Sequence, residues 1–556
     1  MNCYLYQECF LKDITLRTDH TKPETMRIFT GVLLFLICVT LSATDHYPRN
    51  SNIDVVHYEF SIYLSDSYNL IRGEARLRIN HTGNTDEINL DLVALHDDGK
   101  GMTVEEVRID DRPASWHHED DRLKIDLASR KVEGETSNLL IHYYGIPADG
   151  LIISRNRYGD RTFFADNWPD RARNWIPCVD HPSDKAFVDF IVYAPDKYKV
   201  VSNGYLYEES TLPEGVKITH WKEEISIPTK VMVIGVAKFA VRLAGKIGGT
   251  DIWTYVFPED REAGFSDYSV AIDPFTWYSE KIGPYAYEKL ANVQSKTMFG
   301  GMENASCIFY SEVSVTGDGR AERLMAHEIA HQWFGNSVTE KDWHHIWLSE
   351  GFATYLTALY QGSREGETRL RAVMNMARQR VIGYHKLNPA PVIDTTIVDF
   401  MKLLSTNSYQ KGAWVLHMLR NEIGDDLFWS GMQTYYARYR NRNALTSDFE
   451  HAMEEISGRD LSKFFNQWLY LPGHPELKIS WTYNNRREEI NVLVEQEQEN
   501  HIFEFPLDLQ INDRSGSRVE RIMVNQQVQS FVLESANSPY EVIPDPEVRL
   551  LFEDKS

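Results

Sequence analysis

The 556-residue sequence is poor in cysteine, in positive charge and in long apolar runs. Five cysteines are too few for a disulfide framework at this length. The 58 Lys and Arg residues face 81 Asp and Glu residues, which gives a formal net charge of -23. Such a charge repels phosphate backbones, so no nucleic-acid partner is expected. The 42% hydrophobic and 25% charged content is that of a globular protein, and the length predicts more than one domain.

One apolar run lies near the N-terminus. MRIFTGVLLFLICVTLSATDH begins at Met26 and has a basic residue, an apolar run over Ile28–Leu41 and then small residues, the layout of a secretory signal peptide. The run is shorter than the roughly 20 apolar residues that cross a bilayer, so no stable membrane span is expected. We therefore predict an exported protein, periplasmic or secreted, with residues 1–43 as N-terminal extension and signal peptide. An uncleaved membrane anchor is the alternative. Signal removal would leave Cys178 and Cys307, which an oxidising compartment allows to form one disulfide but does not require.

Three regions differ in the spacing of their apolar residues. Over residues 44–257, alternating segments such as HYEFSIYLSD and AFVDFIVYAP are separated by Asn, Asp, Gly and Pro, which predicts an N-terminal antiparallel β domain. Residues 258–471 carry apolar side chains three and four apart, which predicts a mainly helical domain. Alternation returns over residues 472–556, enough for a small C-terminal β-sandwich. The expected fold class is therefore α+β with several domains.

The helical region contains two histidines four residues apart, His327 and His331, in HEIAH. A step of four residues along an α-helix turns about 40° and rises about 6 Å, so both side chains can bind one metal ion. Glu328 is rotated away from direct ligation and can act on a water as general base. A helix whose histidines only pack or cap is the alternative for this pattern alone. Catalytic zinc needs three protein ligands, and Glu350, eighteen intervening residues after His331, is a candidate for the third.

At this point the sequence resembles the M1 family of zinc metallopeptidases, the gluzincin aminopeptidases, which have leukotriene A4 hydrolase as a relative. HEIAHQWFGN and WLSEGFA match the family's HExxH, eighteen-residue spacing and WLNEGFA-like segment, with Ser349 where Asn is usual. The resemblance implies a thermolysin-like catalytic domain with Glu328 as general base and one Zn2+ per subunit. The implied metal ligands are His327, His331 and Glu350. His344 and His345, which lie between the ligands, are interpreted as surface or supporting histidines.

Two more segments extend the resemblance. The residues Gly300, Gly301, Met302, Glu303 and Asn304 resemble the family's GAMEN or GGMEN exopeptidase motif. Two glycines free a backbone edge that can pair with an extended peptide, and Glu303 can then bind the substrate's α-ammonium. A Gly-Gly turn before a solvated glutamate is the alternative for this motif in isolation. Tyr409 in SYQKG resembles the catalytic tyrosine of the family's YEKG segment, a phenol donor for the oxyanion.

Part of the substrate site lacks a clear candidate. DNWPDRARNWIPCVDHPSDKA resembles a family segment that often carries a Glu or Gln as second ligand of the substrate amine. Trp168 takes that position here, so the nearby Asp166 and Asn167 are the remaining candidates for the role. Phe299, directly before the two glycines, is the candidate for the wall of the first side-chain pocket.

Together the motifs predict a zinc-dependent aminopeptidase that hydrolyses the N-terminal bond of peptides with a free N-terminus. Larger relatives add a C-terminal helical domain over the active site. The resemblance implies a short form without it, whose entrance is more open or is closed by another subunit. A metallohydrolase for another substrate, such as a lipid epoxide, is the first alternative. A non-catalytic peptide-binding protein is the second, and the retained ligands and base argue against it. Residue preference and oligomeric state stay open.

Overall fold

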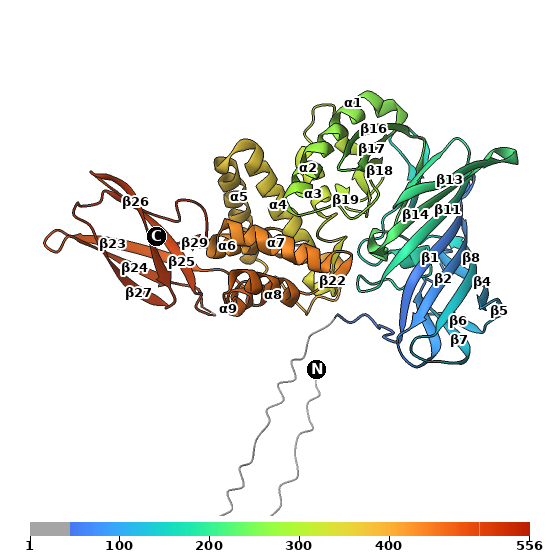
Figure 1. Cartoon of the computed structure of the whole chain (residues 1–556), viewed down its shortest axis with the longest axis horizontal. Helices are drawn as coiled ribbons and strands as arrows, with labels where there is room; N and C mark the ends of the chain where they lie inside the picture. Colours follow the sequence, from blue (N-terminus) through green and yellow to red (C-terminus); the bar gives the residue numbers. More distant parts are fainter. Residues whose placement is uncertain (1–44, 500) are drawn as a thin grey trace, which may run out of the picture. The chain divides into compact units, whose positions relative to one another are not determined.

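The computed structural model describes residues 45–499 and 501–556. The predicted N-terminal extension and signal peptide of residues 1–43 lie outside these residues. Thr44–Ser556 form one compact unit, in which strand-rich segments precede and follow a group of helices (Figure 1). Across the described ranges, no helix is long and apolar enough to cross a membrane. Cys178 and Cys307 are buried free thiols, so the disulfide that the sequence allows is not formed.

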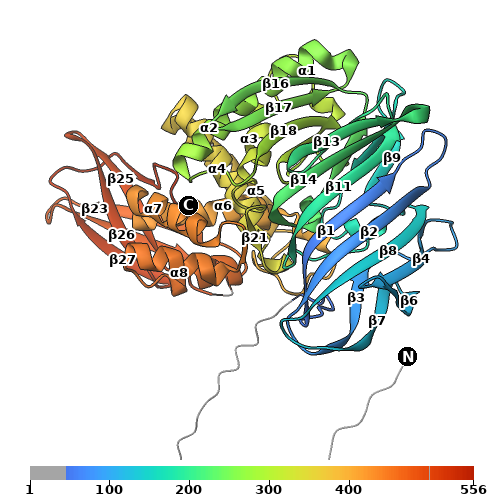
Figure 2. The ribbon, with the colours of Figure 1, turned by 45° about the vertical axis from the view of Figure 1, so that its right-hand side comes forward.

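An eight-stranded sheet dominates the first region, in the order β13-β14-β11-β1-β2-β8-β4-β5. Figure 2 shows its central strands side by side. The strands are β1 (Ile53–Tyr63), β2 (Ile71–His81), β4 (Gly101–Ile109), β5 (Arg112–Pro113), β8 (Thr136–Ile146), β11 (Lys185–Pro195), β13 (Tyr205–Leu212) and β14 (Val216–Pro228). The neighbours pair antiparallel, as predicted, except that β1 and β11 are parallel. The long stretch of chain between β1 and β11 makes such a crossover feasible.

Two smaller sheets complete this region, and their buried residues join the same hydrophobic core. One has the order β3-β7-β6 and the other the order β12-β15-β10-β9. Their strands are β3 (Thr85–Asp91), β6 (Trp116–Glu119), β7 (Arg122–Lys131), β9 (Leu151–Arg155), β10 (Arg161–Ala165), β12 (Lys199–Ser202) and β15 (Ile234–Ala237). The segment that follows β10 reaches the candidate site described below.

A five-stranded sheet, in the order β16-β17-β18-β20-β19, links the strand-rich and helical parts of the chain. It contains β16 (Ala240–Ile247), β17 (Thr250–Val256), β18 (Lys289–Ser295), β19 (Gly301–Met302) and β20 (Cys307–Ser311). The helical periodicity did not predict β18 to β20. The predicted boundary at residue 257 cuts through this sheet, because β17, which precedes residue 257, pairs with β18, which follows it. β19 is an edge strand, antiparallel to β20, and it belongs to the GGMEN segment.

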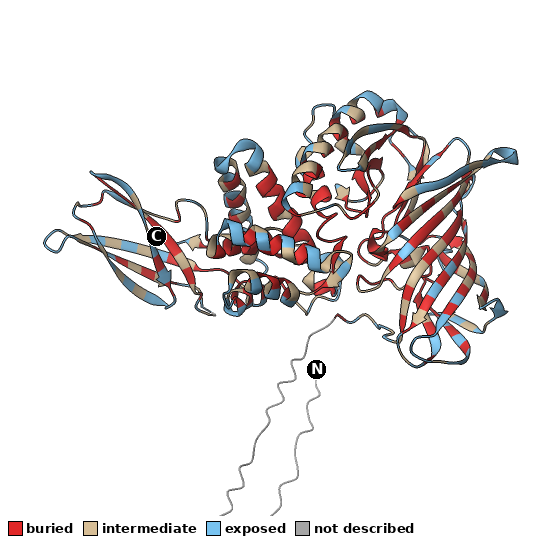
Figure 3. Ribbon diagram, in the orientation of Figure 1, coloured by how far each residue is buried: buried red, intermediate tan, exposed pale blue. Residues whose placement is uncertain are grey.

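The helices follow as predicted. They are α1 (Arg261–Asp267), α2 (Ile272–Lys281), α3 (Glu322–Ala330), α4 (Trp347–Glu365), α5 (Glu367–His385), α6 (Gly412–Ile423), α7 (Asp425–Tyr439), α8 (Thr446–Ser457) and α9 (Ser462–Phe465). A two-stranded parallel sheet of β21 (Val338–Glu340) and β22 (Arg442–Ala444) lies among them. Helix α4 is the centre of the group, since most of its residues are buried, which appears as a nearly continuous red stretch in Figure 3.

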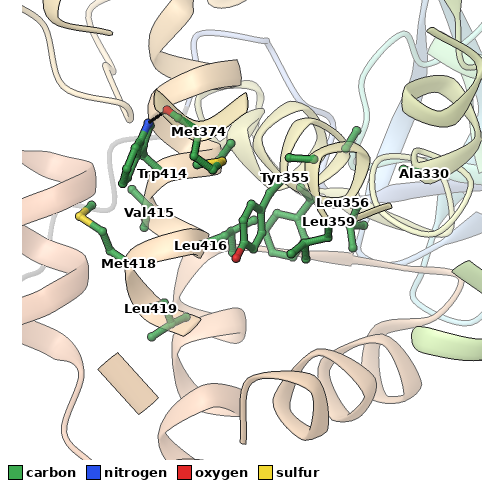
Figure 4. Close-up of a cluster of buried hydrophobic side chains, with 14 of the residues drawn as sticks. Ala330, Tyr355, Leu356, Leu359, Met374, Trp414, Val415, Leu416, Met418 and Leu419 are labelled. Carbon is green, nitrogen blue, oxygen red and sulfur yellow. Dashed lines mark hydrogen bonds between the residues drawn. The ribbon is translucent and has the colours of Figure 1, made fainter. Parts of the chain in front are cut away.

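The core beside α4 explains why this helix is held firmly. Figure 4 shows side chains from α4, α5 and α6 gathered in one apolar cluster, including Tyr355, Leu359 and Leu416. The indole Nε1 of Trp414 donates a 3.1 Å hydrogen bond to the carbonyl oxygen of Met374, which satisfies the polar atom of an otherwise apolar side chain. A densely packed helix gives a rigid support for residues at its N-terminal end.

The last region consists of strands, as predicted for residues 472–556. One sheet has the order β27-β24-β23-β29 and the other the order β26-β25-β28. The strands are β23 (Glu476–Asn484), β24 (Glu489–Gln496), β25 (Phe505–Asp513), β26 (Gly516–Val524), β27 (Val528–Glu534), β28 (Glu541–Pro544) and β29 (Glu553–Asp554). Buried residues of both sheets belong to the same apolar cluster as those of the helices.

Candidate active site

Three side chains from two helices meet at the base of a pocket. His327 belongs to α3, His331 directly follows this helix, and Glu350 lies in the first turn of α4. The Nε2 atoms of the two histidines are 3.2 Å apart. Oε2 of Glu350 lies 3.4 Å from Nε2 of His327 and 3.3 Å from Nε2 of His331. A tetrahedral Zn2+ with bonds of about 2.0–2.1 Å separates its ligand atoms by about 3.3 Å. The triangle therefore fits one such ion with its fourth position open.

The charge of this cluster also fits a cation. Oε2 of Glu350 is buried and has no hydrogen-bond partner within residues 45–499 and 501–556. Burial alone raises the pKa of Glu350, but His331 and then His327 hold this pKa well below its usual value. Burial alone lowers the pKa of His331, but Glu350 and then Glu303 raise it to about 9. The carboxylates thus create a negative field that a metal ion would neutralise.

The ring of His331 is oriented by contacts on its far side. Its Nδ1 lies 3.2 Å from the carbonyl oxygen of Phe334 and 3.0 Å from Oγ of Ser349. Donation from Nδ1 to this carbonyl leaves the Nε2 lone pair directed at the metal position. Gly335 has φ +120°, and a Cβ there would lie 2.3 Å from Oγ of Ser349. Ser349, which stands where the family usually has Asn, thus contacts the candidate metal ligand His331. Its hydroxyl fits there because residue 335 is glycine.

Glu328 and Gly301 fit against each other. Glu328 is buried, and a Cβ on Gly301 would lie 2.5 Å from its Oε1 and 2.6 Å from its Cδ. A Cβ on Gly300 would meet nothing closer than Cδ1 of Leu324 at 3.9 Å. The second glycine therefore makes room for the carboxyl of Glu328, a contact that the sequence did not reveal.

Burial also sets the acid-base character of Glu328. It raises the pKa of the carboxyl well above its usual value; His331 opposes this rise, and Glu303 and Glu350 add to it. A carboxyl with a raised pKa is suited to accept a proton and return it.

Hydrogen bonds hold the backbone of Glu303 in place, whereas one oxygen of its side chain lacks a partner in the described residues. Its carbonyl oxygen accepts hydrogen bonds from Nε2 of Gln332 at 2.7 Å and Nδ2 of Asn336 at 2.6 Å. These donors follow HEIAH directly, so they join the GGMEN segment to the metal-ligand segment. Oε1 of Glu303 is buried and lacks a hydrogen-bond partner in the part of the chain that the structure describes. Burial raises the pKa of this carboxyl, and His331 opposes the rise. The carboxyl group of Glu303 is thus available to bind a cationic group.

Tyr409 lies beside the histidines. It belongs to the π-helical turn Asn407–Lys411, an element that is frequent at functional sites. Its ring stacks on that of His327, with a centroid distance of 5.9 Å and an interplanar angle of 15°. A Cβ on Gly351 would lie 3.0 Å from the backbone of Gly412, so two glycines let this turn approach α4. Burial raises the pKa of Tyr409 well above its usual value, and the nearby carboxylates raise it further, so the phenol keeps its proton.

A cavity of about 250 Å³ unites these groups. Its lining consists of Trp168, Phe299, Gly300, Gly301, Met302, Glu303, Leu324, His327, Glu328, His331, Glu350, Leu404 and Tyr409. The predicted metal ligands, Glu328, Tyr409 and the GGMEN residues are among them except Asn304, which is buried and whose backbone carbonyl contacts Gln332. Residues more than 200 positions apart along the chain thus meet in one space.

The two remaining candidates for the second amine ligand do not line the cavity. Asp166 accepts hydrogen bonds from Nη2 of Arg171 at 2.6 Å, from Oγ1 of Thr297 at 3.0 Å and from the backbone N–H of Met298 at 3.0 Å. Its carboxylate is fully engaged in holding the loop before the glycines. The structure therefore corrects this expectation, since Asp166 has a supporting role.

Asn167 is engaged in the same way. Its Nδ2 donates to the carbonyl oxygens of Thr229 and Met232, at 3.0 and 2.7 Å, and its Oδ1 accepts a 2.9 Å hydrogen bond from Nε1 of Trp175. Its amide is therefore committed to buried backbone and indole groups, and it too is not available to a substrate amine.

The neighbouring aromatic residues do reach the cavity. Trp168 packs edge-to-face against Phe299, at a centroid distance of 6.2 Å, and against Trp343 at 5.7 Å. The position where relatives often carry a polar side chain thus forms an aromatic wall. His344 and His345 do not line the cavity and instead contact the carbonyl oxygen of Ile397 and the hydroxyl of Thr446, in agreement with their interpretation as supporting residues.

Two lysines of the first region hold the segment that follows α3. Nζ of Lys185 donates to the carbonyl oxygens of Asn336 and Ser337, at 3.0 and 2.8 Å. Lys230 forms an ion pair with Glu340, and both side chains are at most 1% exposed. Sequence reasoning missed these contacts, whose only local sign is a charged residue within an apolar segment.

Two family models match the chain. The family model described as Peptidase M1 N-terminal domain matches residues 55–231, and the one described as Peptidase family M1 domain matches residues 267–468. The second match contains all three metal-ligand candidates, Glu328, the GGMEN segment and Tyr409. The first covers the strand-rich region that supplies Trp168.

Similar proteins are named as aminopeptidases. Probable aminopeptidase 2 of Sulfurisphaera tokodaii is 30% identical over 362 residues, which are 62% of this chain and 46% of that protein. Glutamyl aminopeptidase of Sus scrofa is 25% identical over 466 residues, 77% of this chain and 48% of that protein. The chain spans about half the length of the first curated relatives that it matches.

A solved structure has a similar fold. The crystal structure of Legionella pneumophila aminopeptidase A in complex with aspartic acid superimposes with a TM-score of 0.79 and 18% identity. The match covers 91% of this chain and 60% of that chain. At this identity the similarity concerns the fold.

Proposed function

Because the chain belongs to peptidase family M1, we propose that it is a zinc-dependent aminopeptidase that hydrolyses the N-terminal bond of peptides with a free α-amino group. One observation carries the proposal. The buried carboxylate of Glu303, whose Oε1 has no hydrogen-bond partner within the described residues, lies in the same cavity as the metal-ligand triangle. A site for one ammonium group beside the metal position limits hydrolysis to the first peptide bond.

His327, His331 and Glu350 would hold the metal ion. When bound, Zn2+ supplies a Lewis acid that polarises the peptide carbonyl and lowers the pKa of water. Glu303 binds the substrate ammonium, and the free edge of β19 pairs with the extended substrate backbone. These two contacts orient the first carbonyl carbon toward Glu328.

The proton transfers are assigned to Glu328, and stabilisation of the oxyanion is assigned to Tyr409. Glu328 accepts a proton as the water oxygen forms a bond to the carbonyl carbon. The phenol of Tyr409 donates a hydrogen bond to the oxyanion of the tetrahedral intermediate. Glu328 then delivers its proton to the amide nitrogen as the C–N bond breaks. The products are a free amino acid and a peptide shortened by one residue.

We assign a thermolysin-like fold to the region that carries the metal triangle and a β-sandwich to residues 472–556. The superposition on the Legionella pneumophila structure supports the domain arrangement, and the two C-terminal sheets share one buried cluster.

A substrate panel with matched variants tests the activity. Wild-type protein should hydrolyse aminoacyl fluorogenic substrates, lose this activity with a chelator and regain it with Zn2+. Glu328→Gln should lower kcat by about 10²–10⁴-fold, the contribution of a general base, and should keep its bound zinc in elemental analysis. Glu365→Gln, an exposed substitution on α4, is the control and should match the wild type.

Two results would contradict the proposal. Rapid hydrolysis of N-acetylated peptides by the wild type would exclude a site that requires a free amine. Full activity of metal-free protein would exclude the assigned role of the histidine and glutamate triangle.

Export of the protein is proposed on the sequence alone, from the signal-like residues 1–43. N-terminal sequencing of the native protein tests it, and a mature start before Met26 would contradict it.

A further inference from the structure

A second group of metal-binding side chains lies where the chain passes from the helices into the C-terminal sheets. His474, Glu476 and Glu553 each place one ligand atom so that these atoms lie within 4.8 Å of one another. His474 precedes β23, Glu476 begins β23 and Glu553 begins β29. None of the three lines the cavity of the candidate active site. The group is therefore separate from the proposed catalytic metal.

The register of β23 and β29 places two carboxylates side by side, and a bound cation would offset their repulsion. The strands pair in parallel with Glu476 directly beside Glu553, and paired like charges destabilise a sheet. Nζ of Lys555 lies 3.1 Å from Oε2 of Glu476 and 3.2 Å from Oε1 of Glu553, and Nζ of Lys386 lies 2.9 Å from the same Oε1. The lysines thus contact one oxygen of each carboxylate. The other oxygen of Glu553, Oε2, is buried without a hydrogen-bond partner among the described residues.

The imidazole of His474 points to the same place. The residue is 2% exposed, and neither ring nitrogen has a hydrogen-bond partner within residues 45–499 and 501–556. Its Nε2 lies 3.9 Å from the unpartnered Oε2 of Glu553. Buried polar atoms are normally satisfied, because an unsatisfied one costs free energy. A buried ring that faces a buried carboxylate oxygen across a gap too long for a hydrogen bond indicates a missing partner between them.

We propose that His474, Glu476 and Glu553 form a second metal site, which binds a divalent transition-metal ion of the Zn2+ type. One imidazole and two carboxylates form a donor set that Zn2+ accepts, with water in the fourth position. Binding requires the ligand atoms to contract from 3.9 Å between Nε2 of His474 and Oε2 of Glu553 to about 3.3 Å. Small side-chain rotations supply this movement.

The ion has a structural role. It links the segment after the helices to the first residues of two strands that are more than 70 positions apart along the chain. Because Lys386 follows α5 directly and contacts Glu553, the same cluster joins α5 to the C-terminal sheet. Metal binding at this point therefore stabilises the junction between the helices and the last region.

Metal stoichiometry tests the site independently of activity. Wild type, His331→Ala, His474→Ala and the double variant are dialysed against micromolar Zn2+, and bound zinc is measured by elemental analysis. We expect two ions per chain in the wild type, one in each single variant and none in the double variant. Equal zinc in His474→Ala and the wild type would overturn the second site. Equal zinc in His331→Ala and the wild type would instead contradict the proposed catalytic metal, so the two failures are distinguishable.

Further variants separate metal loss from unfolding and from surface binding. Glu476→Gln keeps the size of a half-buried side chain and should also lose one ion; if it folds and keeps both, the proposal is wrong. His451→Ala removes an exposed imidazole from α8 and should keep both ions. Added Zn2+ should raise the Tm of metal-free His331→Ala but not that of the double variant. The same rise in both proteins would also contradict the site.

Discussion

Two buried carboxylates near the active-site cavity, Asp166 and Glu303, differ in how their charge is satisfied. Asp166 belongs to the strand-rich region and accepts three hydrogen bonds from neighbouring groups. Glu303 belongs to the catalytic region and keeps a buried oxygen without a partner in the described residues. A satisfied carboxylate holds structure, whereas an unsatisfied one beside a metal-ligand set has an oxygen available to bind a ligand.

The two regions as a whole differ in what they contribute to the cavity. The region that contains α3 and α4 supplies the three candidate metal ligands, the proposed general base Glu328, the phenol of Tyr409 and the carboxyl of Glu303. The strand-rich region supplies the indole of Trp168, the hydrogen bonds that hold the loop of Phe299, and two lysines that support the segment after α3. One region therefore contributes the chemistry and the other the shape of the cavity, and substitutions should separate these roles.

The largest difference is expected between two adjacent glycines of the catalytic region. Gly301→Ala places a methyl group 2.5 Å from Oε1 of Glu328 and forces the base to move. A displacement of about 1 Å costs about 100-fold in rate, so kcat should fall by about this factor. Gly300→Ala is the matched control, since its Cβ would meet nothing closer than Cδ1 of Leu324 at 3.9 Å. Similar kcat values for the two variants would show that Gly301 does not position Glu328.

The next effect should come from Glu303→Gln. Loss of a hydrogen bond to a charged group costs about 1.5–3 kcal/mol, so kcat/KM for free-amine substrates should fall about 10–150-fold. The measurement is a set of initial rates on aminoacyl substrates with and without the α-amino group. The variant should act on the two kinds of substrate at similar rates. A variant that keeps the full preference for a free amine would place the amine site elsewhere.

Asp166→Ala should chiefly lower stability. It leaves the buried Arg171 and the loop before Phe299 without their acceptor, at a cost of about 1–3 kcal/mol in the free energy of unfolding. Denaturant titration monitored by tryptophan fluorescence measures this loss. If Asp166→Ala instead reduced amine preference as strongly as Glu303→Gln and left stability unchanged, the proposed division between structure and chemistry would be wrong.

The smallest effect on kcat is expected from Trp168→Leu. The smaller side chain reduces the aromatic wall and enlarges the cavity, and a change of this kind in an apolar pocket alters discrimination by about 1–3 kcal/mol. The ratio of kcat/KM between large and small N-terminal residues should therefore rise, with kcat for the best substrate little changed. Trp481→Leu, in β23, is the control and should not alter the ratio.

The sequence predicts the parts of the site that follow local periodicity. His327 and His331 share one side of α3 because they are four residues apart, and Glu350 begins the next long helix, so spacing alone brings these ligands into consideration. The roles of Glu303 and Tyr409 rested on family resemblance, and the structure places both in the metal-ligand cavity. Most of the site residues were thus predicted from short segments with a regular pattern.

Contacts between distant segments were not predictable in the same way. The partners of Asp166 include Thr297, 131 residues away, and nothing in DNWPD indicates that the carboxylate is already engaged. The strand β18 is buried on both faces, so its sequence lacks the alternation that marks a half-exposed strand. The fit of Gly301 to Glu328 likewise depends on how an edge strand packs against a helix.

The ion pair of Lys230 and Glu340 has a consequence for the order of folding. A charge buried without its partner costs several kcal/mol, so neither side chain can take its final position alone. The strand-rich region leaves the ribosome first, yet its surface around Lys230 becomes complete only when residues 336–340 dock on it. The first region to be synthesised thus provides the surface on which residues 336–340 dock. The burial of Lys230 in that region depends in turn on this docking.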